Sequence, residues 1–248
     1  MTGFWSLWKK EMGSYFHSPI AYTTMTFFLV AMGIIFYFLT LLLTAGVPGA
    51  GVIHLIFGSP FYWMTQMVVV PLLTMRLFAE ERRMGTLETL LTAPVADHTV
   101  VFAKFAGVLA FFALIWAPTL LFFAGLHLLS AEMPPLDYGV LVSAYFGVLL
   151  MGGFFLSIGI FCSISSSNQI IAAIYCFVMM LAVYMSGFTE YLTYERELIE
   201  LARLISPQRH LGEFSRGIID TRPVVMCLTG TAFFLFTSIR ILDSRQWK

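Results

Sequence analysis

The sequence predicts an all-α integral membrane protein with six transmembrane helices, and three observations lead to this fold class. Of the 248 residues, 59% are hydrophobic and only 11% are charged. A soluble domain cannot bury that much apolar surface, so lipid is the main solvent expected for this chain. The apolar residues form runs long enough to cross a bilayer, and the largest charged break between them extends from Pro71 to Lys104.

The chain begins with a predicted amphipathic helix, within residues 1–20, that lies in the membrane interface. Residues 4–17 are too few and too polar to cross a membrane. Aromatic side chains such as Trp8 share one face of this helix, while Lys9, Lys10 and His17 face the other way. The helix is expected to end before Ser18 and Pro19. It serves either as a membrane anchor alone or also as a support for a partner on the cytoplasmic face.

Six spans follow, because each run holds about 20 mainly apolar residues. None of them carries a charged residue in its middle, which disfavours a self-powered secondary transporter. The cysteines Cys162, Cys176 and Cys227 lie in or beside apolar runs and are expected to be buried. The spans are predicted near residues 21–44, 57–77, 100–129, 138–163, 169–188 and 223–240.

The distribution of Lys and Arg predicts that both termini are cytoplasmic. In this topology the short outer loops 45–56 and 130–137 contain no Lys or Arg. Five arginines between residues 189 and 222 count against it, but they lie in a long segment beside a late span. The inner side then holds nine basic residues: Lys9, Lys10, Arg76, Arg82, Arg83, Lys104, Arg240, Arg245 and Lys248.

The charged break at residues 78–98 contains a predicted short cytoplasmic helix. Gly85 ends the charged run, and Thr86 can cap a new helix through its hydroxyl. A helix of about eight residues is not stable alone in water, so it must pack against either the membrane domain or a partner. Its apolar face and its end are formed by Leu87, Leu90, Leu91 and Pro94.

These residues carry a resemblance to a known family. The stretch from Pro71 to Lys104, read as PLLTMRLFAEERRMGTLETLLTAPV with a Lys at the start of the next span, resembles the type-2 ATP-binding-cassette (ABC-2) permeases, whose architecture is that of the type V exporters. The last third, with Ser206-Pro207, His210, Phe214, Arg216-Gly217 and Asp220, is similar to the gliding-motility and nitrous-oxide-reductase-maturation branch of that family.

The resemblance implies that the short helix is a coupling helix, which inserts into a cleft of an ATPase subunit. Leu87, Leu90 and Leu91 would then be buried in that cleft, between ends set by Gly85, Thr86 and Pro94. The charged rim of the contact would comprise Glu80, Glu81, Arg82, Arg83 and Glu88, for which a solvated loop face is the alternative.

No lysine of the chain completes the phosphate-binding pattern GxxxxGK[ST]. The expected chain is therefore a permease subunit that is not an enzyme and carries no cofactor or metal, with ATP and Mg²⁺ on a separate ABC ATPase subunit. The resemblance also implies a second permease, either another copy or a paralogue. The expected location is the bacterial inner or plasma membrane, and no nucleic-acid partner is expected. The cargo and its direction stay open.

Two spans supply candidate residues for a substrate path. The span 57–77 is the most polar of the six, and the span 169–188 is rich in Met and Tyr, which make an adaptable lining. Ordinary helix packing is the alternative for each residue. The candidates are Tyr62, Gln66, Tyr175, Met179 and Tyr184.

Residues 189–222 are predicted to form two short amphipathic helices on the extracytoplasmic side, separated at Pro207. They would gate an exit, receive an extracytoplasmic protein partner, or cap the spans. His54 and His210 both fall on this side, but two lone histidines do not make a metal site.

Three other functions are considered. A mechanical ABC subunit would act on an extracytoplasmic partner without moving a substrate. A membrane scaffold would tolerate changes in the coupling segment. An intramembrane serine enzyme would use Ser186 as a nucleophile and would need a histidine at similar depth, whereas all five histidines lie at or beyond the ends of the spans.

Overall fold

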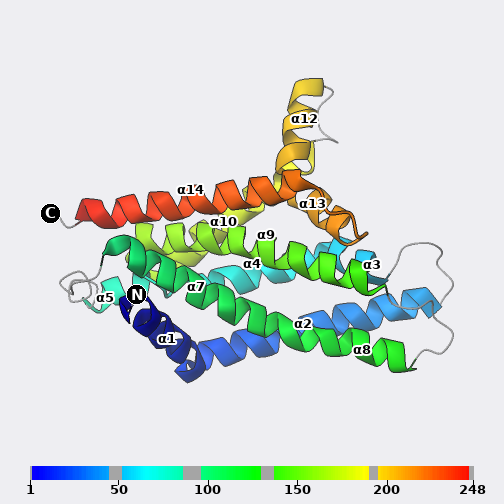
Figure 1. Ribbon diagram of the computed structural model, residues 1–248, viewed down its shortest axis with the longest axis horizontal. Helices are drawn as coiled ribbons and strands as arrows, with labels where there is room; N and C mark the ends of the chain where they lie inside the picture. Colours follow the sequence, from blue (N-terminus) through cyan, green and yellow to red (C-terminus); the bar gives the residue numbers. More distant parts are fainter. Residues whose placement is uncertain (1, 45–51, 86–95, 130–136, 190–194, 246–248) are drawn as a thin grey trace.

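The computed structural model describes residues 2–44, 52–85, 96–129, 137–189 and 195–245, and every regular element within these ranges is a helix (Figure 1). The predicted all-α class is therefore confirmed. The elements are α1 Thr2–His17, α2 Pro19–Thr44, α3 Val52–Gly58, α4 Pro60–Thr74, α5 Ala79–Arg83, α7 Asp97–Trp116, the 3-10 turn η1 Ala117–Thr119, α8 Leu120–Leu129, α9 Tyr138–Ser165, α10 Gln169–Ser186, α12 Arg196–Ile205, α13 Pro207–Phe214 and α14 Thr221–Arg245.

Five helical stretches in the described residues are long and apolar enough to cross a membrane. They correspond to the first, third, fourth, fifth and sixth predicted spans, and the third includes a 3-10 turn around Pro118. Their bounds are Pro19–Phe38, Asp97–Gly125, Tyr138–Ser165, Gln169–Ser186 and Thr221–Ser244.

The predicted second span, residues 57–77, is not one continuous helix. Its main part, α4, has 15 residues, which at about 1.5 Å per residue is shorter than a bilayer core of roughly 30 Å. At its start, the Ser59 side chain accepts a hydrogen bond from the amide of Tyr62, and Pro60 takes the first helical position. At its end, α4 gives way to the turn at residues 75–78. The predicted span is thus made up mainly of α4 and the turn after it, while α3, at Val52–Gly58, precedes it and lies mostly within the predicted outer loop 45–56.

Helix α9 lies at the centre of the bundle. It contacts α4, α7, α10, α13 and α14. In its spanning window 83% of residues are buried inside the protein, against 17% for α10 and for α14. The outward faces of those two helices are apolar, as lipid-facing surfaces are. Close contact with α4 depends on Gly159, because a Cβ atom there would overlap the side chain of Thr74.

The two ends of the bundle differ in what they carry (Figure 1). One end holds α1, α5 and the carboxyl end of α14, and we call it the terminal end. The opposite, distal end holds α3 and α13. The two predicted helices of the segment 189–222 are α12 and α13. Helix α13 packs on α9 and α3 through Leu211 and Phe214, whereas α12 projects away from the bundle.

Candidate functional site

The base of the predicted coupling segment is α5, a single turn of helix at the terminal end. It ends at Arg83, and Gly85 follows with φ +70°, a left-handed conformation that glycine adopts without steric cost. The predicted break at Gly85 is therefore confirmed. Thr86, Leu87, Glu88, Leu90, Leu91 and Pro94 lie outside the described residues, so their predicted roles stay predictions.

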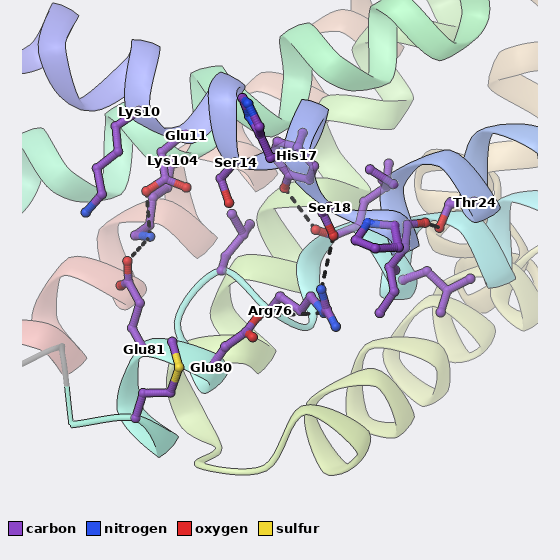
Figure 2. A pocket seen from close by; sticks show the side chains of 18 residues that line it. Lys10, Glu11, Ser14, His17, Ser18, Thr24, Arg76, Glu80, Glu81 and Lys104 are labelled. Carbon is purple, nitrogen blue, oxygen red and sulfur yellow. Dashed lines mark hydrogen bonds and ion pairs between the residues drawn. The ribbon is translucent and has the colours of Figure 1, made fainter.

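A buried ion-pair cluster holds α5 against two other helices (Figure 2). The Nζ of Lys104, on α7, lies 2.8 Å from Oε1 of Glu11 on α1 and 2.8 Å from Oε1 of Glu81 on α5. Only 3% of the Lys104 side chain is exposed, and its Nζ also lies 5.1 Å from the centre of the Phe78 ring. A buried ammonium is costly without partners, so these contacts fix its position. We call Glu11, Lys104 and Glu81 the ion triad.

The turn between α4 and α5 is held by one hydroxyl from α9. Ser163 Oγ accepts hydrogen bonds from the backbone amides of Phe78 at 3.1 Å and Ala79 at 3.3 Å, and it donates to the carbonyl of Met75 at 3.2 Å. The first amides of a helix have no partner within the helix, and the residue before α5, Phe78, provides no side-chain cap. Ser163 supplies the missing acceptor from a helix that is distant in sequence.

The junction between α1 and α2 is tied to the end of α4 in the same region. Tyr15 donates a hydrogen bond to the carbonyl of Leu73 at 2.9 Å, and Arg76 Nη1 donates to Ser18 Oγ at 3.1 Å. Arg76 also lies 3.7 Å from Glu80, a looser ion pair. Around these contacts is a cavity of about 600 Å³, with apolar walls from α2 and α4 and charged groups from α1 and α5 (Figure 2).

The charged residues of α5 do not all face the same way. Glu81 turns inward to the ion triad, whereas Arg82 and Arg83 are exposed. Sequence reasoning missed Glu11 and Ser163. A signal for Glu11 was present: at about 100° per residue it projects only about 20° from Phe4, at the edge of the apolar face, where an acidic residue needs a basic partner.

The candidate path residues do not line one common surface. Tyr62 is buried among Phe57, Trp63 and Trp116, while Tyr175 on α10 is exposed.

Some of the candidate path residues lie near the contact between α4 and α10. The rings of Trp63 and Tyr184 are 5.7 Å apart. Gln66 lies one turn from Trp63 on α4. Trp63 and Gln66 are both almost fully buried, and within the described part of the chain the indole Nε1 and the amide Nε2 have no hydrogen-bond partner. Met179, also on α10, places its sulfur 3.5 Å from that of Cys162.

A second cavity of about 600 Å³ opens at the distal end, and Tyr184 lines it together with α3 and α13. His54 on α3 lies at its rim, with Nδ1 2.7 Å from Ser215 Oγ. The Ser215 hydroxyl donates to the carbonyl of Gly212, so it accepts from His54 Nδ1–H. Nε2 of His54 then accepts from Arg216 Nη2 at 3.1 Å. Partial burial and, second, the charge of Arg216 lower the pKa of His54.

The residues of the alternative enzyme hypothesis are not brought together. The hydroxyl of Ser186 donates to the carbonyl of Val183 at 2.7 Å. His210 is buried and uses Nε2 to contact the carbonyl of Leu204 at 2.8 Å, while His54 has the separate partners named above. Nothing in these contacts activates Ser186 as a nucleophile.

A family model described as "ABC-2 family transporter protein" matches residues 61–242, well over half of the chain. The match begins in α4, includes the ion-triad residues Glu81 and Lys104, and ends in α14. No curated protein matches the chain.

Proposed function

The chain belongs to the ABC-2 family of transporter proteins, and on that premise we propose that it is the permease subunit through which a separate ATPase drives export or translocation of a substrate. As a member of this family it is a multi-pass membrane protein and the transmembrane component of a transporter, not its ATP-binding unit. The described helices that are long enough to cross a membrane fit this role. The coupling route, the path and the orientation that follow are parts of the proposal.

The observation that carries the proposal is the ion triad. A segment that receives force from an ATPase needs a stiff connection to the spans, since a loosely held segment would move without moving them. Lys104 provides this connection, because it lies on α7 and binds α5 through Glu81 and α1 through Glu11. Ser163 adds a second connection, from the start of α5 to α9. Displacement of residues 86–95 would therefore reach α1, α7 and α9 together.

The test is association with the ATPase, and the chosen change lies on the predicted apolar face of the coupling helix. We expect Leu90→Asp to abolish co-purification of an ABC ATPase and the stimulation of its ATP hydrolysis, because a carboxylate would be buried in the cleft. Leu90→Met, which keeps the apolar volume, is the matched control. If the ATPase co-purifies equally with Leu90→Asp, this segment is not the coupling element.

The path that the structure supports best runs between α4 and α10. Trp63 and Gln66 have hydrogen-bond donors there without partners, and Tyr184 connects this contact to the distal cavity. Buried donors without partners are rare in proteins and suit a ligand with oxygen acceptors. A second permease, another copy or a paralogue, would face the exposed sides of α2 and α10 to complete the path.

Both termini are proposed to be cytoplasmic, in a bacterial inner or plasma membrane. In support, α1, α5 and the carboxyl end of α14 lie at the same end of the bundle (Figure 1). Reporter fusions at each terminus and within loop 130–137 test this: both termini should report the cytoplasm, and the loop the outside.

A mechanical role remains the second candidate function, and α12 favours it. This helix projects from the distal end and exposes Leu204 and Ile205 (Figure 1). An extracytoplasmic protein that binds there would be moved by the ATPase cycle without passage of a substrate. Deletion of 196–205 separates the two functions: it should abolish a mechanical output and leave ATP-driven transport intact. If the chain were only a membrane scaffold, Leu90→Asp should leave its function unchanged.

A further inference from the structure

The cavity at the terminal end lies at the depth where lipid headgroups meet the protein. Helix α1 is too short and too polar to cross a membrane, whereas α2, which begins at Pro19, is the first helix long enough to do so. Ser18, between the two, therefore lies near the membrane interface. Arg76 donates a hydrogen bond to Ser18 at 3.1 Å, so its guanidinium lies at the same depth, and both residues line the cavity.

One wall of the cavity is apolar. It is formed by Ile20 and Ala21 of α2 and by Leu72 and Leu73 of α4. The volume of about 600 Å³ falls within the roughly 300–1,000 Å³ of small-molecule sites. A phospholipid headgroup and the first methylenes of its chains fit such a space, while the rest of each chain would lie in the bilayer.

The other wall is charged, and its charges balance. Lys104 lies between Glu11 and Glu81 in the ion triad, so the charged groups outside the triad are those of Lys10, Arg76 and Glu80 (Figure 2). With His17 counted as neutral at pH 7, three basic and three acidic residues line the cavity. A lining with both signs and no net charge is complementary to a ligand of the same kind.

Arg76 and Glu80 lie close to each other without forming a full hydrogen bond. Nε of Arg76 is 3.7 Å from Oε2 of Glu80, beyond the roughly 3.2 Å at which such bonds normally end. This Nε is buried and has no hydrogen-bond partner within the described part of the chain. A guanidinium presents a fork of N–H donors that matches phosphate oxygens, and a carboxylate only accepts. The two side chains thus offer adjacent sites for a phosphate and for a cationic donor.

We propose that this cavity binds one phosphatidylethanolamine molecule from the adjoining leaflet. Its phosphate accepts hydrogen bonds from Arg76, with Lys10 as a second cation, and its ammonium donates to Glu80. The amino end of α2 faces the same space, and the positive end of a helix dipole favours a phosphate there. The inference rests on the membrane position of these helices and not on the proposed transport.

The headgroup chemistry distinguishes this lipid from two others of similar size. The trimethylated ammonium of phosphatidylcholine has no N–H to donate to Glu80. Phosphatidylglycerol carries no cation at all, so it leaves Glu80 unpaired beside its phosphate. A bound phosphatidylethanolamine would also connect the junction of α1 and α2 to α5, next to the ion triad.

The experiment is native mass spectrometry of the detergent-purified full chain, titrated separately with the dilauroyl forms of the three lipids. Wild type should bind one phosphatidylethanolamine per chain. The other two lipids should bind at least about tenfold more weakly, since a hydrogen bond to a charged group corresponds to about that factor. Phosphoethanolamine, which has no acyl chains, should bind more than roughly 100-fold more weakly, because it buries no apolar surface.

Two variants test the assigned contacts. Arg76→Gln should weaken binding of phosphatidylethanolamine and of phosphatidylglycerol alike, by about tenfold or more. Glu80→Gln gives the lining a net positive charge, so it should reverse the preference in favour of phosphatidylglycerol. Arg196→Gln and Glu200→Gln are the matched controls, since these residues form the same i, i+4 pair on exposed α12, and both should bind like wild type.

The comparison of the three lipids on wild type needs no variant, so it decides even if Arg76→Gln fails to fold. The proposal is wrong if wild type binds phosphatidylcholine or phosphatidylglycerol as tightly as phosphatidylethanolamine. It is also wrong if Glu80→Gln keeps the wild-type preference, or if phosphoethanolamine alone binds as tightly as the lipid. None of these outcomes bears on ATPase coupling, which Leu90→Asp tests separately.

Discussion

The Nζ of Lys104 lies 2.8 Å from Oε1 of Glu81, and this ion pair joins α7 to α5, the last helical turn described before residue 86. The two residues flank the predicted coupling helix in sequence. Any force on that helix therefore acts on a loop whose two ends are joined to each other, and Glu11 joins the same point to α1.

Loss of the cation should destabilise this junction. Lys104→Met removes the ammonium from beside two largely buried carboxylates, and removal of one partner from a buried ion pair typically costs about 3–5 kcal/mol. We expect a lower Tm in detergent and weaker ATPase stimulation. The triple variant Glu11→Gln/Lys104→Met/Glu81→Gln should recover much of the Tm, because no charge is then left unpaired. If the Tm of the triple variant is no higher than that of Lys104→Met, the ion-pair explanation is wrong.

The hydroxyl of Ser163 should protect the start of α5. Ser163→Ala removes the acceptor for two buried amides and the donor for the Met75 carbonyl, at a cost of about 1–3 kcal/mol. Hydrogen exchange at the amides of Phe78 and Ala79 should become faster. Ser165→Ala is the control, because that exposed hydroxyl bonds only the Phe161 carbonyl of its own helix. Equal exchange in both variants would mean that Ser163 does not hold the turn.

Close contact between α9 and α4 should make Gly159 intolerant of a side chain. Gly159→Ala places a Cβ atom against Thr74, and such overpacking typically costs about 1–3 kcal/mol. Gly153→Ala on the same helix is the control, since its nearest neighbours would lie at 3.8 Å. Thermal unfolding should separate the two variants. A similar Tm for both would show that the helices can move apart without loss.

Acid should weaken the attachment of α13 to α3. The pKa of His54 is lowered in the folded state, so below its ordinary value of 6.5 the unfolded chain binds more protons than the folded one. The contribution of His54 is complete above about pH 6.5 and is lost as pH falls through the lowered folded pKa. His54→Gln should reduce this loss of Tm between pH 7 and pH 5. A smaller difference between pH 7 and pH 5 in wild type than in His54→Gln would contradict this prediction.

Gln66 offers a test that separates stability from transport. Gln66→Leu removes a buried amide nitrogen without a partner, so the Tm should stay the same or rise by a few degrees. If the donor faces a passing substrate, ATP-driven transport should fall at the same time. Tyr138→Phe, at an exposed residue at the start of α9, is the control for transport. If Gln66→Leu transports as well as wild type, Gln66 is not part of the substrate path.

The elements that follow from local pattern were predictable from the sequence. Long apolar runs predicted α2, α9, α10 and α14, and the position of Pro207 predicted the separation of α12 from α13. Gly85 ended the charged run as expected.

What could not be predicted depends on pairs that are far apart in the chain. Lys104 reads locally as a basic residue at the end of a span, but its partner Glu11 lies 93 residues away. The end of α4 is likewise set by Ser163, 85 residues beyond Phe78. Such long-range contacts override local propensity, and a single sequence holds no record of them.

The interruption of the helix at Met75–Phe78 determines the direction in which motion can travel. If α4 and α5 formed one continuous helix, a displacement of α5 would pass along the helix axis into α4. Instead, four residues of turn separate the two helices. The hydrogen bonds across this turn lead instead to Ser163, and so sideways into α9. Since α9 contacts helices on several of its sides, a displacement there would reach most of the bundle. In the proposed mechanism, a push on α5 along the bundle axis would therefore be converted into a lateral rearrangement of the helices around α9.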